Sequence, residues 1–232
     1  MTTLLFVHSP VVGPSTWIYT AEVLQQNGFG CVVPDLTGVA TMGPPYYPKY
    51  ANVSARAVDD IADTVVVIGH SAAGALLPAV AEAVGDRTAG AVFVDAMLPQ
   101  PGRNWFDTAP RGLEAHLRGL AEDGVLPPYD EWFPPGALAH WVPDPQRRRR
   151  LIAEIPRLPV AYFDEPAPPV RFAASVACAF VRLGAPFDAA ADKAQRLGWW
   201  VVRRDWDHLR MLSAPDAVAD VIALAISATH LD

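Results

Sequence analysis

The sequence is poor in cysteine, in positive charge and in long apolar runs. Its two cysteines, Cys31 and Cys178, both lie in apolar segments, so buried free thiols are predicted and not a disulfide or metal pair. The formal net charge of −7 argues against nucleic acid as the main partner, because phosphate binding needs a basic face.

No apolar run reaches the roughly 18 residues of a membrane span. No basic segment precedes the first apolar residues, so no signal peptide is predicted. We therefore expect a cytoplasmic protein that acts on a small molecule.

Short apolar runs alternate with longer helical patterns along most of the chain. Hydrophobic residues make up 51% and charged residues 19% of the 232 positions, which is typical of a globular chain with one sizeable core. The alternation indicates parallel strands joined by crossover helices. The predicted strands are Leu4–Val7, Cys31–Val33, Thr64–Ile68, Ala89–Val94, Ala177–Leu183 and Trp199–Val202. The predicted helices cover residues 15–26, 54–62, 72–84 and 215–226, and residues 43–50 are predicted to form a loop.

Strand-like segments are missing between residues 99 and 170, where prolines and aromatic residues gather instead. We interpret this stretch as a cap inserted into a single domain spanning residues 1–232, with short helices at 113–122 and 145–154. At least half of the cap aromatics are expected to form a small core of their own. The others are expected to line an apolar pocket, for which Trp105, Trp132 and Trp141 are the candidates. The basic run Arg147–Arg150 is interpreted as a solvated helix face.

A sharp turn from strand to helix is predicted around Ser71. The apolar strand Val65–Ile68 is followed by Gly69, His70 and Ser71, and then by small residues that open a helix. Such a turn lifts the serine hydroxyl above the sheet edge, where helix N–H groups also point. Ser71 is therefore the candidate nucleophile, and the Ala72 N–H is a candidate oxyanion donor. The last glycine of the usual G-x-S-x-G pattern is absent, but Gly74 follows at once. The alternative is a plain serine N-cap.

Three segments together resemble the α/β-hydrolase superfamily, and within it the small plant-type methylesterase and hydroxynitrile lyase branch. They are Phe6-Val7-His8-Ser9-Pro10 with Trp17, the turn Gly69-His70-Ser71, and Asp207-His208-Leu209-Arg210-Met211. The resemblance covers nearly the whole chain except the cap. It implies an α/β-hydrolase fold, with a mostly parallel, doubly wound sheet of about six strands.

The resemblance also implies a catalytic triad. Ser71 is then the nucleophile and His208 the general base, because His208 alone lies between the last strand and the last helix. Asp188 follows the strand that ends at Leu183 and is the predicted acid. Rival acids are Asp192, Asp205, Asp207 and, if the acid follows an earlier strand, Asp95. The other five histidines (His8, His70, His116, His140 and His230) are less suitably placed. No pair shows metal-ligand spacing, so neither a metal nor a cofactor is predicted.

The resembled branch has a glycine after its first-strand histidine, and this chain lacks it. Ser9 and Pro10 follow His8, and proline has no N–H to donate to an oxyanion. The second donor is then the Val11 N–H or the Ser9 hydroxyl, and we expect His8 and Ser9 beside the substrate pocket.

Three functions remain open at this point. The first is a carboxylesterase-like serine hydrolase that cleaves an ester or thioester of a hydrophobic small molecule. The second is a lyase, cyclase or epimerase that uses His208 as base, which the altered loop favours. The third is a catalytically silent ligand-binding protein.

Overall fold

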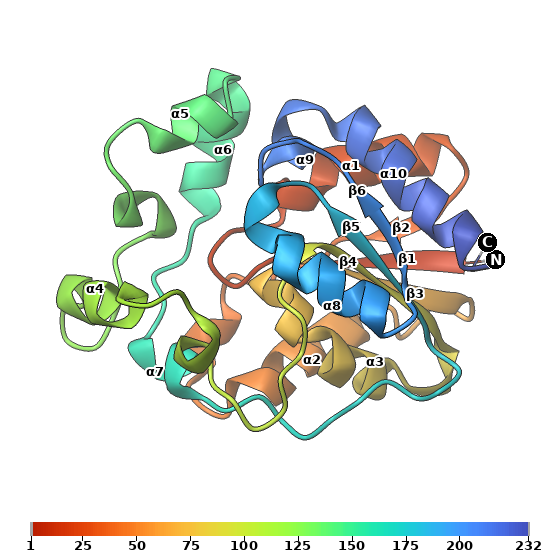
Figure 1. Cartoon of the computed structure of the whole chain (residues 1–232), viewed down its shortest axis with the longest axis horizontal. Coiled ribbons are helices and arrows are strands. Elements are labelled where there is room, and N and C mark those ends of the chain that lie inside the picture. Colours follow the sequence, from red (N-terminus) through yellow and green to blue (C-terminus); the bar gives the residue numbers. More distant parts are fainter. Residues whose placement is uncertain (1, 232) are drawn as a thin grey trace.

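The computed structural model describes residues 2–231, and these form one parallel sheet flanked by helices (Figure 1). The strand order is β2-β1-β3-β4-β5-β6. The strands are β1 (Thr2–Val7), β2 (Gly30–Val32), β3 (Thr64–Ser71), β4 (Thr88–Ala96), β5 (Ala177–Arg182) and β6 (Trp200–Arg203). Every predicted strand is present with small shifts at its ends, and the predicted fold class is confirmed.

Helices cover both faces of the sheet. The chain passes from β1 to the edge strand β2, and then back across β1 to β3 and on to β6. Right-handed crossovers therefore place the first connecting helix on one face and the later ones on the other. Helices α1 (Ser15–Gln26) and α10 (Pro215–Ala228) pack together on one face. Helices α2 (Tyr46–Arg56), α3 (Leu77–Val84) and α8 (Asp188–Arg196) cover the other (Figure 1).

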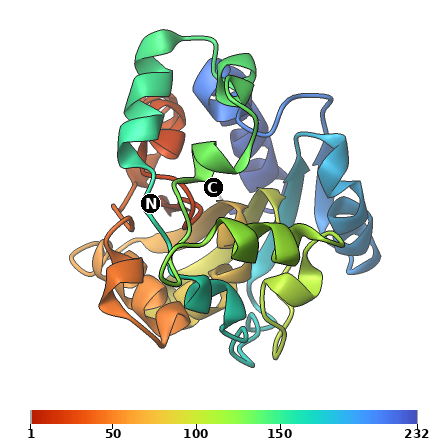
Figure 2. The ribbon, with the colours of Figure 1, turned by 90° about the vertical axis from the view of Figure 1, so that its left-hand side faces the viewer.

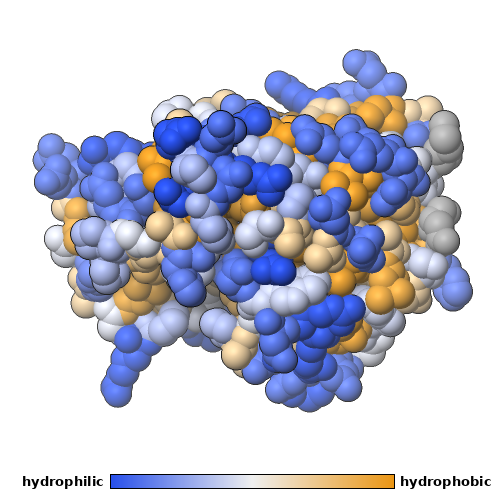
Figure 3. Space-filling model, turned by 90° about the horizontal axis from the view of Figure 1, so that it is seen from above, coloured by the Kyte–Doolittle hydropathy of each residue, from blue (hydrophilic) through white to orange (hydrophobic). Residues whose placement is uncertain are grey.

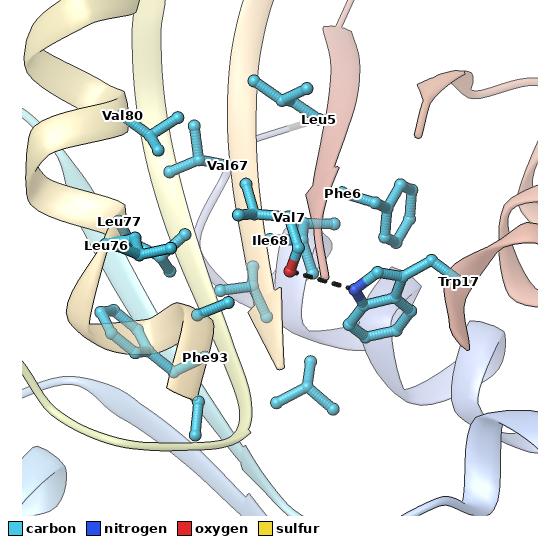
Figure 4. Packing of buried hydrophobic residues seen from close by; sticks show 14 of the residues in the cluster. Leu5, Phe6, Val7, Trp17, Val67, Ile68, Leu76, Leu77, Val80 and Phe93 are labelled. Carbon is cyan, nitrogen blue, oxygen red and sulfur yellow. Dashed lines mark hydrogen bonds between the residues drawn. The ribbon is translucent and has the colours of Figure 1, made fainter. Parts of the chain in front are cut away.

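The core lies where the central strands meet these helices. Leu4 to Val7 of β1 and Val65 to Ile68 of β3 are fully buried, because helices cover both faces of these strands. Each such side chain contributes about 1.5–3 kcal/mol of transfer free energy on folding. Figure 4 shows Trp17 of α1 against the end of β1, where its Nε1–H donates a hydrogen bond to the Val7 carbonyl at 3.2 Å.

Helix α2 begins earlier than the sequence predicts. It starts at Tyr46, within the segment expected to be a loop, and ends at Arg56. Pro48 lies in its first turn, where a missing N–H costs no helical hydrogen bond. The Glu165 carboxylate accepts hydrogen bonds from the Tyr46 and Tyr47 N–H groups at 2.7–2.9 Å. This cap comes from a residue more than a hundred positions away, so nothing in the local sequence indicates it.

The segment between β4 and β5 contains helices and turns and forms the cap seen in Figure 2. Its helices are α4 (Leu113–Leu120), α5 (Ala137–Trp141), α6 (Pro145–Glu154) and α7 (Val160–Asp164). Helix α6 contacts the core directly: Glu154 Oε2 accepts from the Ser15 N–H at 2.7 Å, at the start of α1.

The interpretation of Arg147–Arg150 as a solvated face is wrong for its first member. The Arg147 guanidinium lies 4.5 Å above the Tyr19 ring and donates to the Leu212 carbonyl at 2.8 Å. Leu212 belongs to α9 (Arg210–Ser213). Arg147 therefore joins the cap to the core through a cation–π contact and a charge-assisted hydrogen bond.

The face seen from above in Figure 3 is mostly hydrophilic, with apolar atoms in scattered patches. Among the described helices, none combines the length and apolar character needed to cross a membrane.

Candidate active site

Ser71 lies at the end of β3, immediately before a 3₁₀ turn (Ala72–Ala75) that leads into α3. Its backbone has φ 57° and ψ −127°, a conformation that a residue other than glycine rarely adopts. Such strain persists only where surrounding structure enforces it, and it is concentrated at functional sites. One enforcing contact is the hydrogen bond from the Met97 N–H to the Ser71 carbonyl at 2.9 Å. The predicted sharp turn is therefore present, with the serine hydroxyl at the edge of the sheet.

Two glycines let the turn pack closely against its neighbours. A Cβ atom at Gly69 would lie 2.9 Å from Leu77 Cδ2, and one at Gly74 would lie 2.1 Å from the Met97 carbonyl oxygen. The second contact is with backbone, so a side chain there is excluded. Gly74 thus provides the close approach between the turn and the end of β4. No comparable demand falls on Ala73, whose methyl group is accommodated in the core.

The His208 imidazole is held by Asp95. Its Nδ1 atom lies 2.7 Å from Asp95 Oδ2, and the Asp95 side chain is 1% exposed. The other oxygen, Oδ1, accepts hydrogen bonds from the Leu183 and Gly184 N–H groups at 2.8 and 3.0 Å. Both oxygens are therefore fixed in direction. A carboxylate at Nδ1 keeps the proton on that nitrogen and leaves Nε2 as the basic atom.

Asp188, the predicted acid, does not contact His208. It is the first residue of α8, its side chain is 49% exposed, and it accepts from Arg182 Nε at 2.6 Å. Arg182 also binds Asp205 at 2.9 Å. The prediction is wrong because a buried guanidinium at the end of β5 captures this carboxylate. The acid at the imidazole follows β4, the position that made Asp95 a rival.

A second histidine lies directly behind the first. The His70 ring is buried, and its centroid is 4.3 Å from that of His208. His70 Nε2 donates to the His208 carbonyl at 2.9 Å, so its proton is on Nε2. Burial, with the neighbouring His208, holds the pKa of His70 well below its ordinary value. A neutral His70 thus fixes the backbone of His208.

Ser71 and His208 are close in the fold but are not hydrogen-bonded. Ser71 pairs with Ala96 across the sheet, next to Asp95, and His70 connects the turn to His208. Among residues 2–231, neither the Ser71 hydroxyl nor His208 Nε2 makes a hydrogen bond. The expected direct contact is therefore absent in this form of the molecule, although catalytic contacts of this kind often close only when substrate binds.

The loop after β1 presents Val11 to the site. The Val12 N–H donates to the Ser9 carbonyl at 3.1 Å, which makes Pro10 and Val11 the two central residues of a turn. Pro10 suits the first central position, because its φ angle is already set. Val11 lines the cavity that holds Ser71, and its N–H makes no hydrogen bond to any residue that the structure describes.

His8 orders this loop from within the core. Its Nδ1 donates to the Ser9 carbonyl and its Nε2 accepts from the Leu36 N–H, both at 3.0 Å. Burial lowers the pKa of His8. Both His8 and Ser9 are fully buried and neither lines the cavity. The prediction that they lie beside the substrate pocket is therefore wrong, because the loop turns inward after β1.

A cavity of about 390 Å³ opens above Ser71. Its core side is formed by Val11, Ala72, Met97, Pro186 and Phe187 together with the serine. Its cap side carries Trp105, Tyr129, Trp132 and Phe133, and the polar Thr108 and His116. Trp105 and Trp132 are present in the lining, as predicted. Trp141 does not line the cavity. Its ring packs against the ring of Phe133, with centroids 5.5 Å apart.

Phe187 is a site residue that the sequence does not reveal, and it has a special position. Its ring stacks on His208 with centroids 5.1 Å apart and an angle of 7°, and it lines the cavity. It therefore forms an apolar surface between cavity and imidazole on the core side. Nothing in the local sequence marks it, since it only ends a short 3₁₀ turn (Ala185–Phe187) that leads into α8.

Comparison with known proteins agrees with this architecture. The model of a family described as the alpha/beta hydrolase family matches residues 4–221. No curated protein matches the sequence. Among solved structures, an extracellular α/β-hydrolase from a Paenibacillus species superposes with a TM-score of 0.72 at 17% identity, over 97% of this chain and 98% of that one.

Two further structures are similar to the same degree. Tomato methylketone synthase I gives a TM-score of 0.70 at 15% identity, with 98% of each chain covered. A pyrethroid hydrolase from Sphingobium faniae gives 0.70 at 18% identity, with 96% of each chain covered. At these identities the likeness extends to the fold. Together with the match over residues 4–221, it shows that the chain belongs to the alpha/beta hydrolase family.

Proposed function

We propose that this protein is a serine hydrolase that cleaves an ester or thioester of a hydrophobic small molecule, with Ser71, His208 and Asp95 as its triad. The observation that carries the proposal is the hydrogen bond between His208 Nδ1 and the buried Asp95 carboxylate, beside a strained serine at a strand end. A buried, fully oriented carboxylate on one ring nitrogen prepares the other as a general base.

In the proposed reaction, Ser71 Oγ attacks the carbonyl carbon while His208 Nε2 takes its proton. The resulting oxyanion accepts hydrogen bonds from the Ala72 N–H, at the free N-terminus of the 3₁₀ turn, and from the Val11 N–H. Collapse of the tetrahedral intermediate returns the proton from His208 to the leaving alcohol or thiol. Water then attacks the acyl group on Ser71, with His208 again as base, and releases the carboxylic acid.

Two neighbours support this cycle without touching the substrate carbonyl. The Asp95 carboxylate stabilises the imidazolium that forms at each step. His70 stays neutral at physiological pH because burial lowers its pKa, so it adds no positive charge next to that imidazolium.

The cavity supports a hydrophobic substrate. Most of its lining is apolar or aromatic, which favours an apolar acyl or alcohol group over a sugar or nucleotide. The structure also weakens the main reason for a non-hydrolytic activity, because Val11, which has an N–H, lines the cavity beside Ala72.

Labelling with a fluorophosphonate tests this proposal independently of substrate. We expect the probe to modify Ser71, as read by the mass of its peptide, and the modification to disappear in Ser71→Ala. The Ser213→Ala variant is the matched control, because its hydroxyl lies outside the cavity and donates to the Arg210 carbonyl. A chain that is inert to the probe, or that labels equally after Ser71→Ala, contradicts the proposal.

A further inference from the structure

The cap side of the cavity carries two hydrogen-bond donors that have no partner within residues 2–231, the hydroxyl of the half-buried Tyr129 and the indole N–H of Trp105. Tyr129 begins a 3₁₀ turn (Tyr129–Trp132) and lines the cavity together with Ser71. Its hydroxyl makes no hydrogen bond to any residue in the range 2–231. The other polar groups of this wall differ from it: Thr108 already donates to the Trp105 carbonyl at 2.9 Å, and His116 is exposed on α4. The Trp105 indole N–H also lacks a partner, but it is enclosed by protein atoms, whereas the Tyr129 hydroxyl is open to the cavity.

Packing holds the Tyr129 ring in place. The ring makes edge-on contacts with Trp132 and Phe133, with centroids 5.2 and 5.1 Å apart. Trp132 is itself fixed, because its Nε1–H donates to the Pro127 carbonyl at 2.9 Å. The ring thus has little freedom to turn its hydroxyl elsewhere, and a positioned donor gives up little conformational entropy when it binds.

The Tyr129 side chain is half-buried, and its hydroxyl oxygen remains accessible to water. Burial raises the pKa of Tyr129 to about 12, so the group keeps its proton at neutral pH and acts as a donor. A donor that gains no acceptor when substrate displaces its water loses a hydrogen bond, which weakens binding. A wholly apolar substrate would incur that loss, whereas one that carries an acceptor at this point would not.

We propose that the cavity selects esters or thioesters that carry a second hydrogen-bond acceptor, such as a ketone or ether oxygen, which binds the Tyr129 hydroxyl on the cap side. This inference rests on the proposed function, because Ser71 then acts on the ester group at the core side. The cavity thus divides the substrate into a reacting ester and a recognised polar group, joined by an apolar body that contacts the aromatic walls.

The test measures binding in a Ser71→Ala background, so that no turnover is needed. The ligands are two isosteric pairs: methyl para-acetylbenzoate with methyl para-isopropenylbenzoate, and para-acetylphenyl acetate with para-isopropenylphenyl acetate. Each pair exchanges a carbonyl oxygen for a methylene group, on the acyl side in the first pair and on the alcohol side in the second. Dissociation constants come from tryptophan fluorescence, because Trp105 and Trp132 line the cavity.

We expect the Tyr129→Phe change to weaken binding of the acetyl member about fivefold in at least one pair, as one hydrogen bond is lost. Binding of the isopropenyl member should not weaken, because its methylene group accepts no hydrogen bond from Tyr129 and the variant leaves no donor unsatisfied. Tyr47→Phe is the control: it removes a hydroxyl whose pKa is likewise raised to about 12, but Tyr47 lies outside this cavity. It should alter neither member.

The inference is wrong if Tyr129→Phe changes both members equally, if it changes neither pair, or if none of the four esters binds. The proposed function fails separately. If the preference for the acetyl member depends on Tyr129 while the wild-type chain hydrolyses none of the four esters, the recognition stands and the hydrolase proposal does not.

Discussion

The imidazole of His208 and the carboxylate of Asp95 meet at 2.7 Å although they are 113 positions apart in the chain. Asp95 has φ 44°, which turns its side chain from the end of β4 toward the next strand's loop. There the Leu183 and Gly184 N–H groups hold one carboxylate oxygen and direct the other at His208. Backbone N–H groups therefore set the direction of the Asp95 carboxylate, and the carboxylate in turn sets that of His208.

Replacing Asp95 and Asp188 by asparagine, each in a separate variant, distinguishes the roles of these two candidate acids. Asp95→Asn places an amide N–H₂ at His208 Nδ1, so Nδ1 accepts a hydrogen bond. The ring then carries its proton on Nε2, which can no longer act as a base. We expect kcat for a short-chain aryl ester to fall about 10⁴-fold. Asp188→Asn breaks a half-exposed pair with Arg182 and should change kcat by less than about twofold. Steady-state kinetics with circular dichroism as a check on folding give the answer, and a larger effect at Asp188 would reverse the assignment.

The role of Val11 leads to an expectation for its neighbour Pro10. If the Val11 N–H is the second oxyanion donor, Pro10→Ala adds an N–H that is not needed. Esterase activity should then not rise, and the free energy of unfolding should fall by about 0.4–1 kcal/mol because proline no longer restricts the unfolded chain. Chemical denaturation and aryl ester hydrolysis measure both quantities. A severalfold gain in rate would instead mean that the hole lacks a donor at position 10.

Two buried histidines make stability depend on pH. The pKa values of His8 and His70 are lowered from 6.5, so the unfolded chain binds protons below about pH 6.5 that the native chain does not. The free energy of unfolding should therefore fall as the pH drops from 6.5 to 5, by up to about 1.4 kcal/mol per pH unit for each histidine.

Substitution separates the two contributions. His70→Gln removes one of them, and equilibrium denaturation across this range should show a correspondingly smaller slope. A second substitution, His8→Gln, should reduce the slope again. Slopes that match the wild-type value would show that neither ring resists protonation.

The cap is joined to the core partly through Glu165. Glu165→Ala leaves the first N–H groups of α2 without their acceptor, so we expect a loss of about 1 kcal/mol of stability. Glu131→Ala is the matched control, since Glu131 is an exposed cap carboxylate with no side-chain hydrogen bond among the described residues. Thermal unfolding of both variants compares them directly, and equal melting temperatures would show that this contact adds nothing.

Several features of the site follow from local sequence patterns. Ser71 is identifiable because an apolar strand, small residues and a helix pattern surround it, and these are local properties. His208 is identifiable from the segment it shares with a known family. Asp95 also has a signal, since it is a lone acid at the end of an apolar strand, but the sequence ranks Asp188 above it. Arg182 decides the matter, and its proximity to Asp188 arises only when β5 and α8 pack together.

Hydrophobic periodicity and residue size act within a few positions, and they are enough to predict the six strands, most of the helices and the strained serine turn. Long-range packing, in contrast, selects which acid holds His208, turns His8 and Ser9 inward, places the start of α2 at Tyr46, and brings some of the cap aromatics to the cavity. Each of these depends on a partner far away in the chain, such as Leu183 for Asp95 or Glu165 for Tyr46. These hydrogen bonds and ring contacts join segments that are distant in the sequence. The distances between such segments are defined only in the folded chain.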